Sequence, residues 1–561
     1  YTLWHTLSLH DALPISAFSH AVQIGNAITE KKMVDTILQA RDEGLFSAIT
    51  DCGAGGLSSA VGEMGEKLGA EVHLDRVPLK YAGLSYDEIW ISEAQERMVL
   101  AVPPENVERI LRLFEAEAVE ATVIGHYGVT APGSAGDVTP TLRLFYGEHL
   151  VGEVDLAFLA DGLPRPTKEA VYDKAPRPSP APPARDRYDD ALLAILASPN
   201  VASKEWIVRQ YDHEVQGGSA IKPLVGIAED GPGDAAVVRP VLDSCKALAI
   251  SCGMNPRLGP LDAYRSALHA VDEAVRNNVA VGGNLDRLAL LDNFCWGNCN
   301  KPDRMGALVQ AAKACRDAAL AYGTPFISGK DSLNNEFQTE DGETIAIPPT
   351  LLVSAISVVK DVSRCVTADA KAAGNLLFIL GRTGGDLGGS HYLLAEGVET
   401  GNDVPPVDLE CNLLVMRGLQ RAIEAGLARA CHDLSEGGLS VAAAEMAFAG
   451  GLGVEIDAER MPLRDDAVAL TARLFAEDAG RFLVEVAPAD RDAFLAAMAA
   501  DTGRVCRQAA SSAHQQDPIP VAEIGRVTGS GRIFVTHGEA TLIDTPAAEA
   551  KAAWQKTFVS C

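Results

Sequence analysis

Apolar and polar positions follow two rhythms along the chain, and together they are typical of a mixed protein of helices and strands. Apolar residues three or four positions apart predict helices, whereas short apolar runs next to Gly, Pro or Asp predict strands. Helices are expected at 30–43, 57–68, 104–116, 261–281, 413–424, 439–448 and 489–500. Strands are expected at 45–49, 98–102, 351–359, 376–380, 427–431 and 482–486, and immediately before Asp292 and Ser328. Because the two kinds of element alternate, we expect an α+β fold with helices layered on sheets.

Part of this pattern occurs twice. The segment Asp51–Met64 recurs as Asp433–Met446, with eight of fourteen residues identical at an offset of 382. Matches in the same order continue for about 130 residues, which is typical of an internal duplication. Pairs that correspond further along are Glu93 with Glu477 and Arg97 with Arg481.

The domain boundaries follow from the duplication and from local composition. Residues 164–183 contain seven of the thirty prolines, among Lys, Arg and Asp, and this composition predicts an extended linker. The segment at roughly 190–365 has no counterpart, so we expect that its partner preceded residue 17 and that an N-terminal domain is missing. Residues 1–16 continue none of these patterns and look like a translated sequencing adapter. The expected division is 1–16 adapter-derived, 17–163 first C-terminal-type domain, 164–190 linker, 191–365 N-terminal-type domain, 366–545 second C-terminal-type domain and 546–561 tail.

Charge narrows the classes of ligand. The 561 residues include 48 basic and 76 acidic side chains, a net charge of −28. Sequence-independent binding to nucleic acid or to anionic lipid needs a basic surface, so neither is expected. A phosphate ligand would have to be held by backbone N–H groups and metal ions. The eleven cysteines form no C-x-x-C pair and no zinc spacing, so we expect reduced thiols and a cytoplasmic protein.

Two glycine turns are the first candidates for chemistry. Asp51 and Asp433 each stand at the end of an expected strand, just before Gly-Gly-Leu-Ser at the start of a helix. Glycines let backbone N–H groups approach a phosphate closely, and a carboxylate beside them can hold Mg²⁺. The alternative is an ordinary N-cap in a tight turn, which needs no ligand. A third glycine-rich loop, 384–390, lacks the Lys-Ser/Thr ending of a Walker A motif.

Further polar residues stand in the segment between the two copies. Glu273 and Asn277 are four residues apart and so share one face of an expected helix. Asp292, Gly329 and Ser332 follow two expected strands, and strand ends often carry ligand contacts. The alternative is that these residues only end strands and form turns, without binding a ligand. The twelve histidines show no common spacing and are expected to be structural.

These segments resemble the synthetase subunit of the phosphoribosylformylglycinamidine synthase family (FGAM synthase II), within the aminoimidazole ribonucleotide synthetase superfamily. The resemblance covers about 17–545 and implies tandem units, each with an N-terminal and a C-terminal domain, of which the first N-terminal domain is missing. The motifs that carry it are AVQIG at 21–25, TDCGAGGL at 50–57, VHLDRVPL at 72–79, WISEAQERM at 90–98, DNFCWG at 292–297, SGKDS at 328–332 and HDLSEGGL at 432–439.

The resemblance also implies roles for single residues in the first copy. It implies that Asp51 binds Mg²⁺ and that Gln23 contacts the substrate. The triplet Glu93, Ala94 and Gln95 occupies a second substrate-binding position, where the small form of the family more often has Ser at the centre.

Further along the chain, the resemblance implies that Asp292 and Gly329 contact ATP and that Ser332 contacts the substrate. Lys330 stands where the small form of the family has a metal-binding Asn. The large form also has Lys there, so the resemblance does not imply that this position binds a metal. By resemblance to the large form, the residues of an auxiliary Mg²⁺–nucleotide site are Glu273, Asn277, Asp433 and Ser435.

The implied activity is the ATP-dependent conversion of formylglycinamide ribonucleotide and ammonia to formylglycinamidine ribonucleotide, through a phosphorylated amide intermediate. ATP and Mg²⁺ are the implied cofactors, and a separate glutaminase subunit, with or without a small bridging subunit, is the implied partner. The family's catalytic His lies in the first domain, so we expect this polypeptide alone to be inactive. The alternatives are another enzyme of the superfamily, such as a kinase or cyclo-ligase, and an inactive nucleotide-binding or scaffold module.

Overall fold

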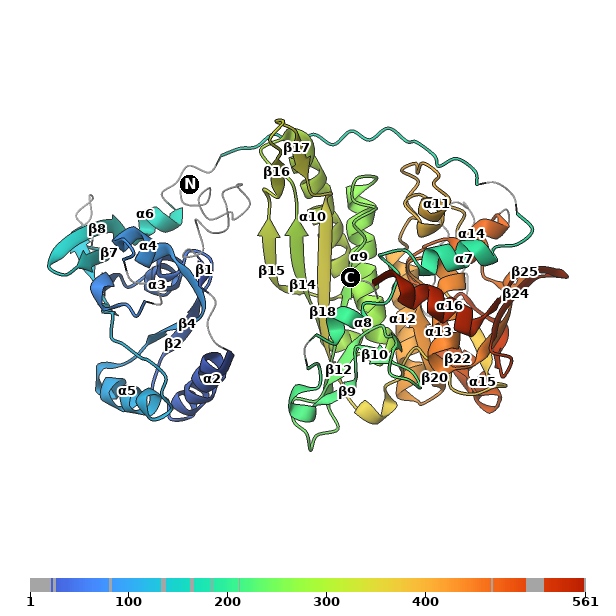
Figure 1. Cartoon of the computed structure of the whole chain (residues 1–561), viewed down its shortest axis with the longest axis horizontal. Helices are drawn as coiled ribbons and strands as arrows, with labels where there is room; N and C mark the ends of the chain where they lie inside the picture. Colours follow the sequence, from blue (N-terminus) through green and yellow to red (C-terminus); the bar gives the residue numbers. More distant parts are fainter. Residues whose placement is uncertain are drawn as a thin grey trace. The chain divides into compact units, whose positions relative to one another are not determined.

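The computed structural model divides the chain into two compact units (Figure 1). The first comprises residues 1–167 with 337–344, and the second comprises 168–336 with 345–561. The residues that the structure describes are 22–23, 27–79, 83–132, 138–161, 166–182, 185–210, 212–465, 468–500 and 519–558. The expected adapter, 1–16, lies outside the described residues.

The first unit is built from two small sheets and the helices around them. One sheet has the strand order β1-β4-β2, and the other has the order β5-β3-β7-β6 with β8 beside β7. Its elements are β1 (Val22–Gln23), α2 (Ala27–Asp42), β2 (Ala48–Cys52), α3 (Leu57–Gly65), β3 (Ala70–His73), α4 (Tyr86–Ile91), β4 (Glu93–Ala101), α5 (Val107–Ala116), β5 (Gly125–Tyr127), β6 (Thr130–Pro132), β7 (Val138–Tyr146), β8 (His149–Asp155) and α6 (Leu156–Asp161).

The second unit contains a six-stranded sheet, β15-β14-β18-β13-β12-β9, and a seven-stranded sheet, β20-β22-β19-β23-β21-β24-β25. Its helices are α7 (Asp189–Leu196), α8 (Glu205–Val208), α9 (Ala263–Ala280), α10 (Pro302–Tyr322), α11 (His391–Ala395), α12 (Leu409–Glu424), α13 (Gly438–Gly450), α14 (Leu470–Phe475), α15 (Arg491–Ala499) and α16 (Ala547–Gln555). The strands of these two sheets are β9 (Ser219–Ile221), β12 (Ala236–Val238), β13 (Ala247–Gly253), β14 (Leu288–Cys295), β15 (Phe326–Ser332), β18 (Thr350–Val359), β19 (Leu376–Leu380), β20 (Ala428–Asp433), β21 (Gly453–Asp457), β22 (Phe482–Val486), β23 (Val521–Thr528), β24 (Arg532–His537) and β25 (Ala540–Pro546).

Alternating apolar side chains give the second unit its layers. On β19, Phe378 and Leu380 pack into a core that also contains α9, α10, α12 and α15, whereas Leu377 and Ile379 pack into a core with α7, α13, α14 and α16. Because successive side chains of a strand point to opposite faces, this central strand is buried on both sides. The seven-stranded sheet therefore lies between two helical layers (Figure 1).

Strand pairing repeats between the two copies, which confirms the predicted duplication. In the first copy β2 is antiparallel to β4, and β3 is antiparallel to β5 and parallel to β7. In the second copy β20 is antiparallel to β22, and β21 is antiparallel to β23 and parallel to β24. In the second copy β19 also pairs with both β22 and β23 and joins these strands into one sheet, whereas the equivalent position of the first copy lies outside the described residues.

The described part of the proline-rich segment, residues 166–182, has no regular secondary structure, but it is not a free connection. Its residues 168–182, here called the strap, have no regular secondary structure and are hydrogen-bonded to the second unit. The Val171 N–H donates to the carbonyl of Pro302 at 2.9 Å, and the Ser179 N–H donates to Asp403 Oδ1 at 2.9 Å. The Ser179 hydroxyl also donates to Asp403 and accepts from the Gly401 N–H. Proline composition predicted the extended backbone but not these contacts.

Ser179→Ala is expected to release the middle of the strap, because it removes both hydrogen bonds made by the hydroxyl. Each such bond contributes about 1 kcal/mol, so with both removed, cleavage by trypsin after Lys174 should become roughly 30-fold faster. The matched control is Ser363→Ala, whose hydroxyl bonds to Asp361 within its own turn and should leave cleavage at Lys174 unchanged. Equal cleavage rates in both variants would show that these contacts do not hold the strap.

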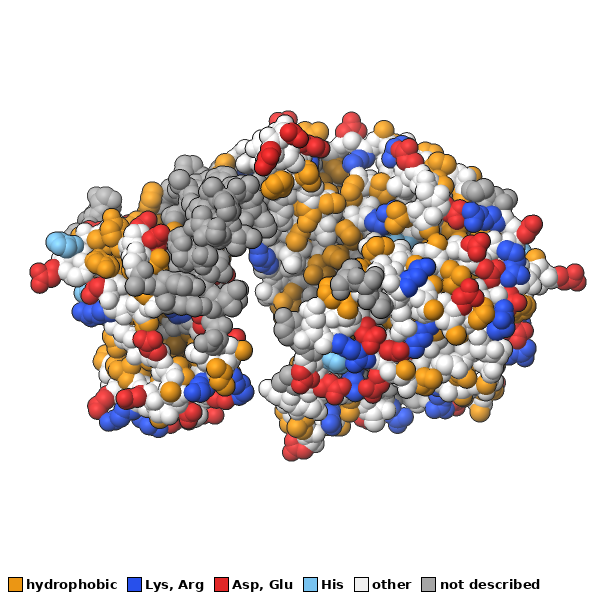
Figure 2. Space-filling view, in the orientation of Figure 1, with side chains coloured by type: hydrophobic (Ala, Val, Ile, Leu, Met, Phe, Trp, Pro, Cys, Tyr) orange, Lys and Arg blue, Asp and Glu red, His pale blue; other side chains and the backbone are white. Residues whose placement is uncertain are grey.

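The surface charges and the state of the cysteines were both predicted from the composition. On the face shown in Figure 2, basic side chains are interspersed with acidic ones. In the described part of the chain, no helix combines the length and the apolar character needed to cross a membrane. Among the described residues, eight cysteines are free thiols, whereas Cys411 is disulfide-bonded, so the expectation of reduced thiols is wrong at that position.

Candidate functional site

Several residues singled out in the first unit meet in one row across the sheet β1-β4-β2. Ala94 on β4 is the register partner of Gln23 on β1 and of Cys52 on β2. Glu93 and Asp51 are the immediate neighbours of this row in sequence. The structure therefore brings the backbones of all the predicted first-copy residues together, while the side chains of Gln23 and Gln95 lie outside the described residues.

A glycine makes this meeting possible. Gly56, just before α3, has a φ of 56°, and a Cβ on it would lie 2.2 Å from the carbonyl oxygen of Ser92. Only a residue without a side chain lets the start of α3 approach the start of β4 so closely. The exposed Asp51 stands at the end of β2, five residues before this glycine, so the predicted carboxylate and the glycine turn belong to one segment between β2 and α3.

A second group lies on neighbouring strands of the six-stranded sheet. Asp292 on β14 and Gly329 on β15 are register partners, and a Cβ on Gly329 would lie 2.2 Å from Asp292 Oδ1. Glycine is therefore required for the carboxylate to lie over β15. Burial raises the pKa of Asp292, and the nearby Asp331 raises it further. Lys330 Nζ donates to Ser332 Oγ at 2.7 Å. The predicted Asp292, Gly329 and Ser332 therefore lie on β14 and β15, two neighbouring strands at one side of the sheet.

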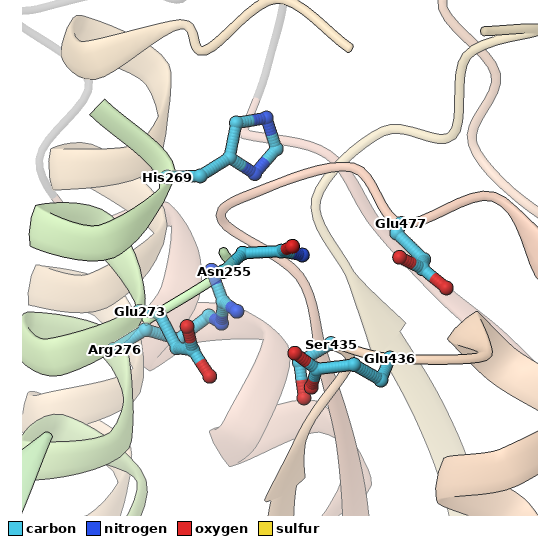
Figure 3. A pocket seen from close by; sticks show the side chains of 7 residues that line it. All are labelled: Asn255, His269, Glu273, Arg276, Ser435, Glu436 and Glu477. Atoms are coloured by element: carbon cyan, nitrogen blue, oxygen red, sulfur yellow. The ribbon is translucent and has the colours of Figure 1, made fainter. Parts of the chain in front are cut away.

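A third group lines a pocket between α9 and the turn after β20 (Figure 3). Two of the predicted residues, Glu273 on α9 and Ser435 on the turn, face each other there. Asn277 follows Glu273 by one helical turn, and its Nδ2 donates to the Cys252 carbonyl at 3.1 Å. The full lining is Asn255, His269, Glu273, Arg276, Ser435, Glu436 and Glu477.

Arg276 ties the predicted Asp433 into this group. The guanidinium is 3% exposed, and its Nη2 lies 2.9 Å from Asp433 Oδ2. On its other side Arg276 pairs with the fully buried Asp272. Asp272 also accepts hydrogen bonds from Asn412 and from the Gly480 N–H, at 2.8 and 2.9 Å. One buried ion network therefore connects α9, α12 and the loop before β22 with the end of β20.

The structure adds residues that the sequence reasoning missed. Asp234, just before β12, lies with His432 and Asp433 so that one ligand atom of each falls within 4.8 Å of the others. His432 donates to Asp234 Oδ1 at 2.6 Å and to Glu445 Oε2 at 2.9 Å. A signal for Asp234 was present, because it is a carboxylate next to Gly-Pro-Gly, although here the glycines precede the Asp and a strand follows, the reverse of the order at Asp51.

Protonation in the pocket is set by burial and by crowding of carboxylates. Burial raises the pKa of Glu273 well above its usual range, and Glu436 raises it further. Burial also raises the pKa of Asp433 to about 6, although Arg276 acts in the opposite direction. Burial likewise raises the pKa of Glu436. For Glu477 the effect of burial is outweighed by His391, and its pKa is lowered.

The donor set fits a hard divalent cation. Asp234 Oδ2 and Asn277 Oδ1 are buried oxygens that have no hydrogen-bond partner among the described residues. Unpaired buried polar atoms are costly, and carboxylate and amide oxygens are the ligands that Mg²⁺ and Ca²⁺ prefer. Each of these two oxygens can therefore accept a cation or a hydrogen bond from a ligand.

Comparison with protein families divides the chain in the same way as the duplication. The model described as "AIR synthase related protein, C-terminal domain" matches residues 4–134 and 372–507. The model described as "AIR synthase related protein, N-terminal domain" matches residues 232–359. The two matches to the C-terminal model contain the two copies, and the single N-terminal match contains Glu273, Asn277 and Asp292.

Solved structures support the fold. The chain resembles the structure of PurLQS from Thermotoga maritima with a TM-score of 0.59 and 24% identity, covering 90% of this chain and 68% of that one. It resembles T. maritima PurL complexed with ATP with a TM-score of 0.59 and 23% identity, covering 90% and 67%. At these identities the likeness establishes the architecture of tandem α+β units.

Curated relatives are more similar in sequence. The phosphoribosylformylglycinamidine synthase subunit PurL of Thermococcus sibiricus is 35% identical over 466 residues, covering 83% of this chain and 61% of the relative. That of Anaeromyxobacter dehalogenans is 34% identical over 545 residues, covering 91% of this chain and 67% of the relative. The chain thus spans about 60% of the length of the first of these relatives and two thirds of the second. From this identity, and from the matching fold, the chain belongs to the phosphoribosylformylglycinamidine synthase subunit PurL family.

Proposed function

We propose that this chain is part of the synthetase subunit of a ligase that makes formylglycinamidine ribonucleotide in purine biosynthesis. The observation that carries this proposal is the 34% identity over 91% of the chain to a curated family member. The substrates would be formylglycinamide ribonucleotide, ATP and ammonia, and the products would be formylglycinamidine ribonucleotide, ADP and phosphate.

The reaction balances in two steps. The amide oxygen of the substrate attacks the γ-phosphorus of ATP, and ADP leaves. Ammonia then adds to the activated carbon, and the C–O bond breaks to release inorganic phosphate and the amidine. Such phosphoryl transfer depends mainly on positioning and on neutralising the phosphate charge, which Mg²⁺ supplies when bound. An acidic chain of net charge −28 makes that neutralisation necessary.

In the first unit, the row of Gln23, Ala94 and Cys52 is the proposed substrate-binding edge. Gln23 and the triplet Glu93, Ala94 and Gln95 would contact the ribonucleotide, and Asp51 would hold Mg²⁺ beside the N-terminus of α3. The close approach of Gly56 to Ser92 supports this assignment, because it places the carboxylate turn next to the triplet.

In the second unit, we assign two nucleotide-contacting groups. Asp292 and Gly329 would contact ATP and Ser332 the substrate, supported by their register on adjacent strands. An auxiliary Mg²⁺–nucleotide site would use Ser435 for the nucleotide and Glu273, Asn277 and Asp433 for the metal. The unpaired Oδ2 of Asp234 adds a further metal ligand to that set.

Ammonia would come from glutamine on a separate glutaminase subunit in the cytoplasm, with or without a small bridging subunit. Because the chain covers only 61% of the length of the Thermococcus relative, we expect this polypeptide alone to bind nucleotide but not to turn over. The alternative is an inactive nucleotide-binding or scaffold module of the same superfamily.

The test has a binding arm and a turnover arm. Calorimetry of the full chain with ATP is expected to show binding in Mg²⁺ that is lost in EDTA, and ADP release with substrate and ammonium chloride is expected to stay at background. A chimera in which residues 17–558 replace the matched part of the Anaeromyxobacter relative is expected to form the amidine. Binding without turnover in that chimera would favour the scaffold alternative, and absence of nucleotide binding would contradict both.

A further inference from the structure

Because of the internal duplication, the helix end that precedes the triplet Glu93, Ala94 and Gln95 has an equivalent in the second copy. At this point the two copies are related by an offset of 384, so that Ser92 and Arg97 correspond to Ala476 and Arg481. In each copy a short helix, α4 or α14, ends one residue before Ser92 or Ala476. The carbonyl at the end of a helix lacks an intrahelical partner and favours a nearby cation.

In both copies an arginine donates a hydrogen bond to that carbonyl. Arg97 Nη2 donates to the Ser92 carbonyl at 2.9 Å, and Arg481 Nη2 donates to the Ala476 carbonyl. Neither arginine has a hydrogen bond or ion pair to a carboxylate among the described residues. A buried or half-buried arginine usually pairs with a carboxylate. An arginine that instead donates to a backbone carbonyl points to a role in holding the backbone.

On the opposite side of the same carbonyl lies a glycine, again in both copies. A Cβ on Gly56 would lie 2.2 Å from the Ser92 oxygen, and one on Gly438 would lie 2.5 Å from the Ala476 oxygen. Both glycines have positive φ, 56° and 61°. We call the first-copy set, Gly56, Ser92 and Arg97, the carbonyl clamp. It joins the glycine turn that follows Asp51 to the residue that precedes Glu93.

The second copy shows what such a clamp does to the glutamate that follows it. Glu477, directly after Ala476, accepts a hydrogen bond at 2.8 Å from the Gly437 N–H in the glycine turn. Arg481 is fully buried and makes two more hydrogen bonds, to Thr383 Oγ1 and to the Asp478 carbonyl. In the second copy, the equivalent arginine, carbonyl and glycine thus hold Glu477 in contact with the glycine turn.

We propose that Arg97 is a positioning residue for substrate binding, which fixes Glu93 relative to the turn after Asp51 by holding the Ser92 carbonyl against Gly56. The assignment of Glu93 to the substrate rests on the proposed function, whereas the clamp itself rests on the geometry. Arg97 touches the backbone rather than the substrate, so its loss should act through Glu93.

Cys52 provides a local probe of the clamp. It is fully buried, it is the register partner of Ala94, and Arg97 lies close enough to its thiol to interact with it. In Arg97→Gln, alkylation of Cys52 by N-ethylmaleimide, followed peptide by peptide in the full chain, is expected to become about 10-fold faster. The buried Cys431 of the second unit should keep its rate. The matched control is Arg112→Gln, an exposed arginine paired with Glu108 on α5, which should change neither rate.

Substrate affinity separates positioning from general destabilisation. Titration of the full chain with formylglycinamide ribonucleotide is expected to show about 10-fold weaker binding for Arg97→Gln and for Glu93→Gln. The double variant should bind within about 2-fold of Glu93→Gln alone, because residues that act through one contact are not additive. Arg97→Lys, which keeps one cationic donor, should recover part of the affinity and serves if Arg97→Gln does not fold.

The outcomes distinguish the two proposals. An unchanged Cys52 rate in both Arg97 variants would overturn the clamp, and so would fully additive losses of affinity. If the unaltered chain binds no formylglycinamide ribonucleotide while Cys52 still responds to Arg97→Gln, the clamp stands and the proposed substrate role of the triplet fails.

Discussion

Arg276→Met is expected to lower the free energy of unfolding of the second unit by about 3–5 kcal/mol, the usual cost of removing one partner from a buried ion pair. The variant would leave two carboxylates without their cation, Asp272 fully buried and Asp433 with a side chain only 5% exposed. Glu273 lies one residue along α9 and adds to the repulsion. Urea denaturation followed by tryptophan fluorescence would measure the loss, since Trp296 is buried in this unit.

The control for this prediction uses the same substitution at an exposed pair. Arg417 lies 3.0 Å from Asp286, with side chains 34% and 63% exposed, and solvent screens such pairs strongly. Arg417→Met should therefore cost less than about 1 kcal/mol. If Arg276→Met cost no more than its control, the buried network would not stabilise the unit. A Met side chain of similar length keeps packing losses small in both variants.

Raising the pH from 5 to 7.5 in the presence of a chelator is expected to destabilise the second unit. The pKa of Asp433 lies at about 6 in the folded chain, above its ordinary value of 3.8. A raised carboxyl pKa gives stability that is complete below pH 3.8 and is lost as the pH rises through 6. For Asp433 the whole loss amounts to roughly 3 kcal/mol, of which about 1.4 kcal/mol falls above pH 5. Glu273 and Glu436, whose pKa values are also raised, act with the same sign.

Magnesium is expected to reverse this loss, because a cation takes the place of the bound protons. Melting temperatures measured in EDTA should fall as the pH rises from 5 to 7.5. At a Mg²⁺ concentration about 10-fold above the dissociation constant, they should stay nearly constant over the same range. Asp433→Asn should flatten the EDTA profile without Mg²⁺. Glu477 has a lowered pKa and works in the opposite direction only below pH 4.5. A rise in stability with pH in EDTA would contradict the assignment of raised pKa values.

Much of the fold was predictable because it depends on local pattern. The helix at 57–68 and the strand at 376–380 were visible as apolar periodicity, and the structure has α3 and β19 there. The duplication was visible because glycine turns tolerate few substitutions where φ is positive, as at Gly56 and Gly438. The strap was predicted only in its extended conformation, since its contacts depend on surfaces far away in the sequence.

The sequence by itself determined the α+β class, the duplicated turns and the residues that resemble the family's site, because each rests on neighbours within a few positions. Tertiary structure alone decided which charges share a site. Asp234 lies 199 residues from Asp433, and Arg276 lies 157 residues from it, yet both are bonded to it. No local pattern encodes such pairs, because burial brings them together and burial also makes their charges costly enough to need one another.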